Sequence, residues 1–133
     1  MDYRTFTASL SGLKGYYKEI GKLNSKQEDL LYIMSGVRGL SFDQVIVHGS
    51  PSLSEERRLE LIDKYNAMEE KKNTLRKMAA IVENTLDRMP KELQRMLSMK
   101  YIEGKSYEHI SAIYGYSING LWHHMKRETE KYL

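Results

Sequence analysis

The chain has 133 residues, of which 41% are apolar, enough for one compact unit or two small ones. It has no cysteine, which excludes disulfides and thiolate metal sites, and neither a long apolar run nor a signal-peptide pattern, so we expect a cytoplasmic protein with no membrane segment. A net charge of +3 permits a polyanionic partner without requiring one, and the composition is typical of an all-α protein.

Residues 1–38 are predicted to be helical. Their apolar and amide side chains alternate in steps of four and three, which is a heptad seam. The seam consists of Phe6, Leu10, Leu13, Tyr17, Ile20, Asn24, Gln27, Leu31 and Met34. Ser25 and Glu28 have capping-box spacing, so the segment is either one helix or two helices broken near Asn24.

Residues 39–52 are predicted to be a loop, because Gly39, Asp43 and the run Gly49-Ser50-Pro51 are turn formers. Inside it, residues 45–47 are β-prone but too short for a sheet, and the simplest role for them is a plug against the helices. Ser52 and Glu55 form a second capping box that should open the next helix.

A long helix is predicted from about Leu53 to Arg88. It carries a second heptad seam, formed by Leu61, Tyr65, Met68, Lys72, Leu75, Ala79, Val82, Leu86 and Met89. The simplest arrangement of residues 1–88 is an antiparallel, coiled-coil-like hairpin in which each seam buries the other. The alternative is a homodimer through the same seams. Lys72 in the seam should lower stability and could fix the register.

Residues 89–133 predict three short helices. Pro90 suits a helix start, and Leu93, Met96, Leu97 and Tyr101 follow at helical spacing up to Gly104. Ser106 can cap a second helix whose apolar face is Ile110, Ile113 and Tyr114, and Gly115 suits a turn with positive φ. Ser117 can cap a third helix that turns Leu121 and Met125 inward. Two helices joined by a tight turn with glycine predict a helix-turn-helix.

This last third of the chain resembles the fourth region of sigma-70-type factors, which reads the promoter −35 element. The matching landmarks are Met89, Pro90, Tyr101, Glu103, Gly104, Ser106, Tyr107, Glu108, Ile110, Gly115, Ser117, Leu121, Met125 and Arg127. Ser111 and Gly120 depart from the pattern, where Ala and a better helix former are usual. Given its length, the whole chain resembles the RinA-like and ArpU-like late transcriptional regulators of Gram-positive phages, as does the segment 36–51. The resemblance implies a phage or prophage regulator in a bacterial host cell that binds double-stranded promoter DNA and activates late genes with host RNA polymerase.

The third helix carries the candidate contacts to bases and groove, which are Ser117, Ile118, Asn119, Trp122 and His123. Asn119 is the best candidate because asparagine pairs bidentately with adenine, although a polar residue in a first helical turn can have no such role. Ile118 and Trp122 can contact thymine methyl groups or sugars. Trp122 could instead complete the core, and His123 could simply be solvated.

Phosphate contacts are expected from Lys100, Lys105, Lys126 and Arg127, with a hydroxyl from Tyr107. Each of these cations could equally be an ordinary solvated charge. From Pro90 to the C-terminus seven Lys and Arg face five Glu, so this domain is weakly basic. We therefore expect modest intrinsic DNA affinity.

Enzymatic activity and cofactors are not predicted. His123 and His124 are adjacent, so on a helix they diverge by about 100° and cannot form the metal pair of two histidines four residues apart. Gly12 and Gly15 lack the GK[ST] of a phosphate loop, and no serine lies in a nucleophile elbow. Two alternatives remain for the whole protein. In the first, the helix-turn-helix does not read DNA and the helical hairpin docks polymerase or a sigma factor. In the second, the protein is a small terminase subunit, which would form a ring-like oligomer.

Overall fold

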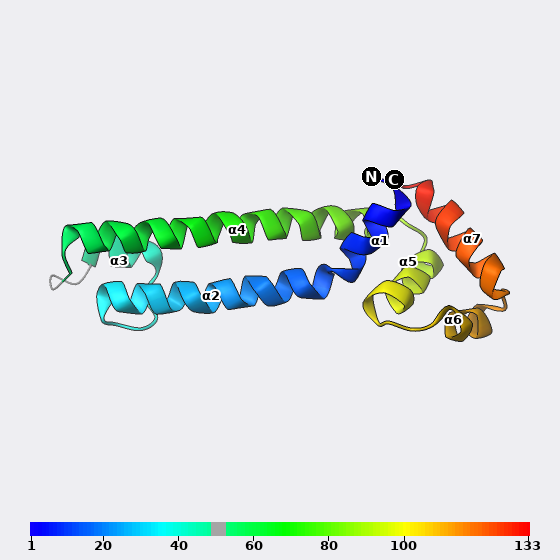
Figure 1. Ribbon diagram of the computed structural model, residues 1–133, viewed down its shortest axis with the longest axis horizontal. Coiled ribbons are helices and arrows are strands. Elements are labelled where there is room, and N and C mark those ends of the chain that lie inside the picture. Colours follow the sequence, from blue (N-terminus) through cyan, green and yellow to red (C-terminus); the bar gives the residue numbers. More distant parts are fainter. Residues whose placement is uncertain (49–52) are drawn as a thin grey trace. The chain divides into compact units, whose positions relative to one another are not determined.

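The computed structural model describes residues 1–48 and 53–133, and within these ranges it is all-helical and has no strand (Figure 1). The predicted all-α class is therefore confirmed. The helices are α1 (Tyr3–Ser11), α2 (Leu13–Ser35), α3 (Phe42–His48), α4 (Glu55–Asp87), α5 (Lys91–Leu97), a π-helical turn η1 (Ser98–Ile102), α6 (Tyr107–Tyr114) and α7 (Ile118–Glu130). None of the helices in these ranges combines the length and apolar character that a membrane crossing requires.

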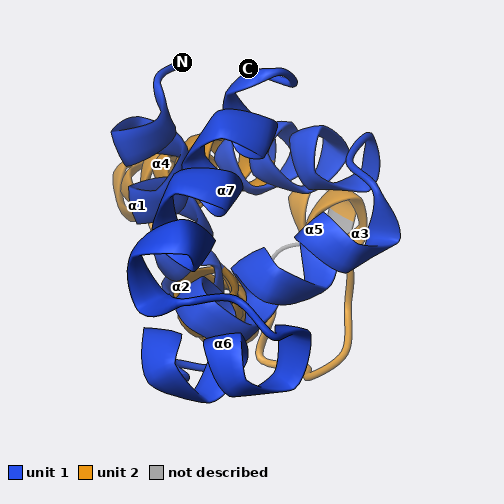
Figure 2. Ribbon diagram, turned by 90° about the vertical axis from the view of Figure 1, so that its right-hand side faces the viewer, with its two compact units in different colours: residues 1–16, 77–133 blue, residues 17–76 orange. Residues whose placement is uncertain are grey.

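The packing divides the chain into two compact units (Figure 2). Unit 1 contains residues 1–16 and 77–133, and unit 2 contains residues 17–76. This grouping differs from the predicted division at residue 88, because the start of the chain packs with its end. The helices α2 and α4 each contribute residues to both units.

In unit 2, the described parts of α2 and α4 lie side by side and run in opposite directions. Gln27 donates to the Tyr65 carbonyl (3.3 Å) and to Glu69 (3.0 Å), whereas Asn24, earlier in α2, accepts from Lys72, later in α4 (2.7 Å). The apolar core of this unit is Leu30, Leu31, Met34, Val45 and Leu61.

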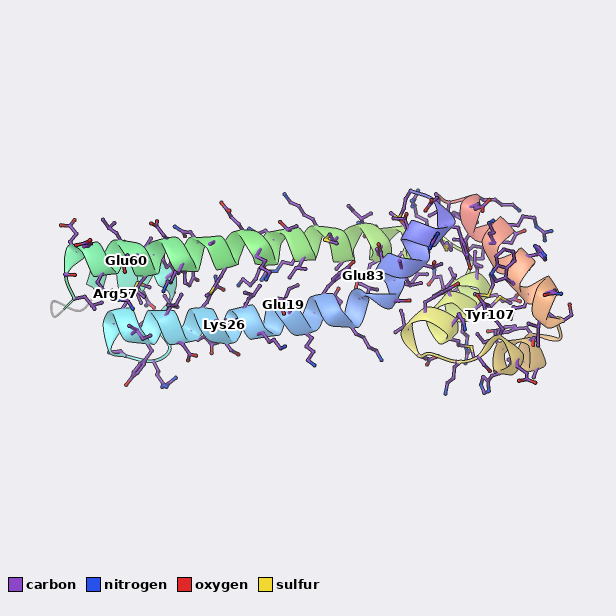
Figure 3. All side chains as sticks on the ribbon, in the orientation of Figure 1. Glu19, Lys26, Arg57, Glu60, Glu83 and Tyr107 are labelled. Atoms are coloured by element: carbon purple, nitrogen blue, oxygen red, sulfur yellow. The ribbon has the colours of Figure 1, made fainter. Side chains whose placement is uncertain are left out.

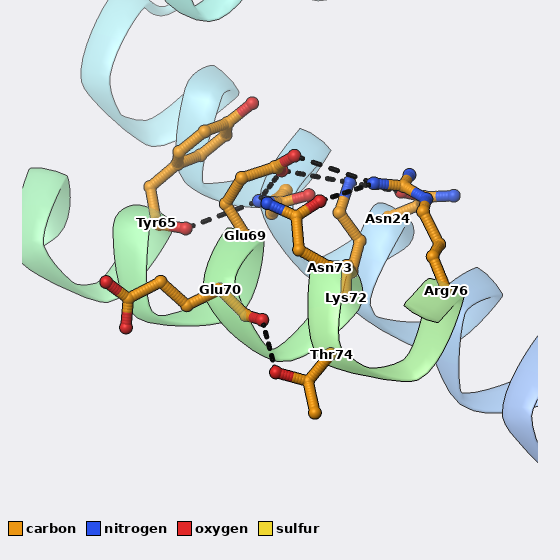
Figure 4. A network of polar contacts seen from close by, with 9 residues as sticks. Asn24, Tyr65, Glu69, Glu70, Lys72, Asn73, Thr74 and Arg76 are labelled. Atoms are coloured by element: carbon orange, nitrogen blue, oxygen red, sulfur yellow. Dashed lines mark hydrogen bonds and ion pairs between the residues drawn. The ribbon is translucent and has the colours of Figure 1, made fainter. Parts of the chain in front are cut away.

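A polar network occupies the middle of the α2–α4 seam (Figure 4). The buried Lys72 side chain is 8% exposed, and its ammonium lies 2.7 Å from Asn24 Oδ1 and 3.1 Å from Glu69. Glu69 also accepts from Gln27 and lies 3.7 Å from Arg76. The hydrogen bond from Gln27, more than the nearby Lys72 ammonium, lowers the pKa of Glu69 below its usual value.

Residues 42–48 form a helix, so the prediction of a continuous loop was wrong there. The side chain of Ser41 accepts from the Gln44 amide (3.3 Å), and the side chain of Gln44 accepts from the Ser41 amide (2.8 Å). This reciprocal capping box was overlooked in the sequence. Val45 is 1% exposed in the core of unit 2, so the expected plug is confirmed for this residue.

The start of α4 also differs from the prediction. The helix begins at Glu55 rather than Leu53, and Ser54 caps it by accepting from the Arg57 amide at 3.1 Å. The predicted cap residue Ser52 and the turn formers Gly49, Ser50 and Pro51 lie outside the described residues. Arg58 of the second turn donates to the carbonyl of Ile46, which ties α4 to α3.

In unit 1, α1 is a separate helix that ends at Ser11, with Gly12 as its C-cap residue. The prediction of a break near Asn24 was therefore wrong, as was the capping role of Ser25 and Glu28, which lie inside α2. Asp2 caps α1 by accepting from the Thr5 amide at 2.7 Å. Phe6 and Leu10 are fully buried in one core with residues of α4, α5, α6 and α7.

The seam residues of α4 are placed largely as predicted. Leu61, Lys72, Ala79 and Val82 are buried, as is Met89, which follows the end of the helix. In α2 the pattern holds less well, because the buried positions include Leu23 and Leu30, which lie outside the predicted seam, while Tyr17 is 50% exposed.

Candidate nucleic-acid interface

The helices α6 and α7 are bounded by the caps that the sequence predicted. Ser106 Oγ accepts from the His109 amide (3.1 Å), and Ser117 Oγ accepts from the Gly120 amide (3.0 Å). Between the two helices Gly115 has φ +78°, a left-handed conformation that favours glycine. The caps and the turn therefore fix where α7 begins, which fixes the residues of its first turn.

The inner faces of α6 and α7 are small but fully buried. Ile110, Leu121 and Met125 have no exposed surface and belong to the core of unit 1. The assignment of Ile113 to the apolar face was wrong, because its side chain is 56% exposed. Ser111 occupies the buried position instead, and its hydroxyl donates to the Glu108 carbonyl at 3.1 Å, which satisfies it inside the unit.

The outer face of α7 brings the predicted groove residues together. Asn119, Trp122, His123 and Lys126 have the spacing of one helical stripe; the first three are exposed and Lys126 is partly exposed. Trp122 is 38% exposed, so it does not complete the core. Its ring packs edge-on against His123 with centroids 4.9 Å apart, and the Lys126 ammonium lies 5.3 Å from its centroid. Ile118, half-exposed, and Ser117 adjoin this stripe at the N-terminus of the helix.

Carboxylates accompany the cations near the C-terminus of α7. Lys126 lies 4.0 Å from Glu130, and Glu128 lies 3.4 Å from Arg127 and 2.8 Å from Lys131. Exposed pairs of this kind contribute about 0–1 kcal/mol, so they hold the cations loosely. The structure therefore leaves Lys126 and Arg127 able to exchange these partners for a phosphate.

The remaining expected phosphate contacts lie on other elements. Lys105 is exposed in the turn before α6, and the Lys100 ammonium of η1 lies 4.1 Å from the centroid of the Tyr107 ring. The hydroxyl of Tyr107 is already hydrogen-bonded within the unit, to Tyr101 at 3.2 Å. A phenol donates one hydrogen bond, so this hydroxyl can donate to a phosphate where it accepts from Tyr101.

Three tyrosines form a chain of hydroxyl groups that joins α1, η1 and α6. Tyr101 lies between Tyr3 (3.1 Å) and Tyr107 (3.2 Å). Burial is the main cause that raises the pKa of all three, that of Tyr101 to about 12, and each ionised ring would also repel the next. This chain ties the first helix to the helices that carry the candidate interface.

We expect unit 1 to lose stability at alkaline pH. Because the pKa of these tyrosines is raised in the folded state, the unfolded chain ionises first as the pH rises. Their contribution to the free energy of unfolding is therefore fully present below about pH 10 and is lost as the pH rises toward 12. A tyrosinate absorbance titration should show a late-titrating group that the Tyr101→Phe variant lacks. If every tyrosine titrates near pH 10 in the folded protein, the buried chain is wrong.

The helix α1 adds a surface that the sequence interpretation missed. Asp2, Tyr3, Arg4 and Thr7 of the chain's start and Trp122, Lys126 and Glu130 of α7 line a groove of about 460 Å³. The heptad pattern assigned α1 to a hairpin, and so hid its contact with α7. The signals that could have revealed a separate helix are the cap at Asp2 and the glycine at position 12.

Gly120, which departs from the sigma-like pattern, lies directly against the helix cap. A Cβ atom at this position would meet Ser117 Oγ at 2.8 Å, so the cap hydroxyl would have to move. The absent side chain thus accommodates the cap at the N-terminus of α7.

Comparison with protein-family models, with curated proteins and with solved structures found no match to this chain.

Proposed function

We propose that the protein binds double-stranded DNA through α6 and α7, which act as a helix-turn-helix with α7 in the major groove. The observation that carries the proposal is the outer stripe of α7. Asn119, Trp122 and His123 are exposed on a helix whose opposite side is anchored by the fully buried Leu121 and Met125. A helix held in this way presents a rigid set of side chains to a groove.

The chemistry of the stripe suits DNA reading from its N-terminal end. Asn119 in the first turn can pair with adenine, and Ile118 beside it can contact a thymine methyl group. Further along the helix, Trp122 can lie against sugars while Lys126 and Arg127 neutralise phosphates. With Lys100 and Lys105 they make four expected phosphate contacts, which support modest affinity that depends on salt.

In the full proposal, the chain is a phage or prophage transcriptional regulator. The helix-turn-helix at its C-terminus would bind a promoter in the manner of sigma-70 region 4, and it would act on late genes with host RNA polymerase. The α2 and α4 segments of unit 2 would form the antiparallel hairpin, which could also pair with a second copy. This part rests on the resemblance of residues 89–133 and on the exposed stripe of α7.

The test is a selection from a random duplex library, followed by fluorescence anisotropy on the enriched and scrambled sequences. We expect an enriched site, and a loss of about 5- to 150-fold in its affinity on Asn119→Ala, equivalent to about 1–3 kcal/mol. The control is Asn84→Ala, the same change at an exposed position of α4 in unit 1. No enrichment, or equal losses in both variants, would remove the proposal.

A second candidate is a protein-docking module without DNA reading. The observation that favours it is the pair Ile113 and Ile118, which flank the turn at Gly115 and are 56% and 50% exposed. Apolar contact with a polymerase subunit or a sigma factor would be insensitive to salt, whereas DNA binding falls steeply with salt. Binding to polymerase that Ile113→Ser weakens while DNA binding is absent would favour this candidate.

A further inference from the structure

Three lysines form a cationic stripe that winds slowly around α2 in unit 2. Lys18, Lys22 and Lys26 are all exposed and are four residues apart. Each step of four residues advances about 6 Å along a helix and turns it by about 40°, so the stripe is about 12 Å long. By the helical period the middle of the stripe lies on the side of α2 opposite the buried Ile20 and Gln27, and Figure 3 labels Lys26 at its end.

The stripe is not neutralised by carboxylates. Most other cations of unit 2 have partners: Arg57 pairs with Glu60, Lys71 with Glu19, and Lys72 and Arg76 with Glu69. Among the described residues no carboxylate lies within ion-pairing distance of Lys18, Lys22 or Lys26. Glu19, which follows Lys18 directly, is turned to Lys71 of α4 at 3.4 Å. Glu28 and Asp29 follow Lys26 by two and three residues and are exposed, but neither lies within ion-pairing distance of it. The three ammonium groups are therefore available to an outside polyanion.

Gly21 lies beside the stripe in the interior of α2, where no close neighbouring atom requires a glycine. A glycine destabilises a helix interior relative to alanine, and a Cβ atom at this position would meet nothing within 4 Å. The exposed Ser25 is also small. Because the side chains of Gly21 and Ser25 project little from the helix, a large rigid partner can come close to the helix backbone beside the lysines.

We propose that Lys18, Lys22 and Lys26 bind the phosphate backbone of double-stranded DNA. Lysine ammonium groups act as mobile point charges that suit phosphates, and an evenly spaced row of one sign matches a polymer with a regular charge every few ångströms. The contact carries no sequence information, so it adds affinity and salt dependence. This inference rests on the proposed DNA binding and places a second, non-specific contact on unit 2.

The experiment measures affinity for a long random duplex against salt concentration. In the variant Lys18→Gln/Lys22→Gln/Lys26→Gln the magnitude of the slope of log K against log salt should fall by about 2.7, or about 0.9 per phosphate contact. Between 50 and 200 mM salt the wild-type affinity should therefore drop about 40-fold more than that of the variant. The control is Arg38→Gln/Arg57→Gln/Lys64→Gln, which removes the same net charge from unit 2, leaves Glu19 paired with Lys71 and should change the slope little.

An unchanged slope in the stripe variant, or an equal fall in the control, would overturn the inference. Loss of binding to poly-glutamate with unchanged DNA binding would instead assign the stripe to an acidic protein. The proposed base recognition by α7 is tested by a different quantity, the ratio of specific to random affinity. The stripe variant should keep this ratio, whereas Asn119→Ala should reduce it and leave the slope unchanged.

The close approach of DNA to the helix backbone at Gly21 can be tested separately. Leucine is a good helix former, so Gly21→Leu should preserve or raise the helix content measured by circular dichroism. It should still weaken binding to the random duplex several-fold, because the new side chain holds the backbone of the helix away from the phosphates. Unchanged affinity in a folded Gly21→Leu variant would contradict the close approach.

Discussion

Replacing Leu10 by alanine is expected to lower the free energy of unfolding of unit 1 by about 2–5 kcal/mol. Leu10 has no exposed surface, and it packs in one core with α5, α6 and α7. The loss combines the transfer of the removed methyl and methylene groups with the cavity they leave. Because α1 contacts η1 and α7, the same variant should also weaken DNA binding through the proposed interface.

Guanidinium titration followed by the fluorescence of Trp122, the single tryptophan of the chain, reports on unit 1. The matched control is Ile81→Ala, which removes the same number of carbon atoms from a side chain of unit 1 that is 55% exposed, and it should cost less than about 0.5 kcal/mol. A loss below about 1 kcal/mol in Leu10→Ala would show that α1 is not part of this core.

The place of α1 could not be predicted, because a heptad pattern does not identify its partner. Phe6 and Leu10 continue the same steps of four and three as Leu31 and Met34, yet the first pair packs in the core of unit 1 and the second in the core of unit 2. The chain breaks at Gly12 without breaking the pattern. In α4, where the seam stays on one face of one helix, the pattern placed Leu61, Ala79 and Val82 correctly.

The short helix α3 shows why local propensity failed in the middle of the chain. Residues 45–47 favour a strand, but a lone strand has no partner, whereas the Ser41–Gln44 capping box and the burial of Val45 favour a helix. The turn chemistry around α6 and α7 was more informative. The predicted roles are confirmed for all three turn residues: helix caps at Ser106 and Ser117, and a left-handed turn at Gly115.

The candidate interface was predictable where the inner face of a helix was unambiguous. With Leu121 and Met125 inside, the helical period left Asn119 and Trp122 outside. On α6 the sequence placed both Ile110 and Ile113 on the inner face, and only the first of these assignments was correct. The structure buries Ile110 with Ser111 because a serine can bond its own helix backbone, and it leaves Ile113 exposed.

Removing Glu69 is expected to lower the free energy of unfolding of unit 2, whereas removing the charge of Lys72 is not. Glu69→Ala should destabilise unit 2 by about 1–3 kcal/mol, because it leaves the buried Lys72 ammonium with Asn24 alone. This is below the usual cost of breaking a buried pair because the Glu69 side chain is 38% exposed. Lys72→Met should be neutral or stabilising, since it replaces a buried charge with an apolar side chain and leaves Glu69 its bonds to Gln27 and Arg76.

The double variant decides whether the buried ammonium is the cause. If it is, Glu69→Ala/Lys72→Met is more stable than Glu69→Ala, as measured by hydrogen exchange in residues 17–35. The control is Glu60→Ala, which breaks the exposed Arg57 pair of the same i,i+3 spacing and should cost less than about 0.5 kcal/mol.

The contribution of Glu69 should also depend on pH. Because the pKa of Glu69 is lowered in the folded state, its carboxylate stabilises the folded protein at pH values above its usual pKa, and this stabilisation is lost as the pH falls through the lowered value. The difference between wild type and Glu69→Ala should therefore shrink below about pH 4, and a constant difference would contradict the ion pair.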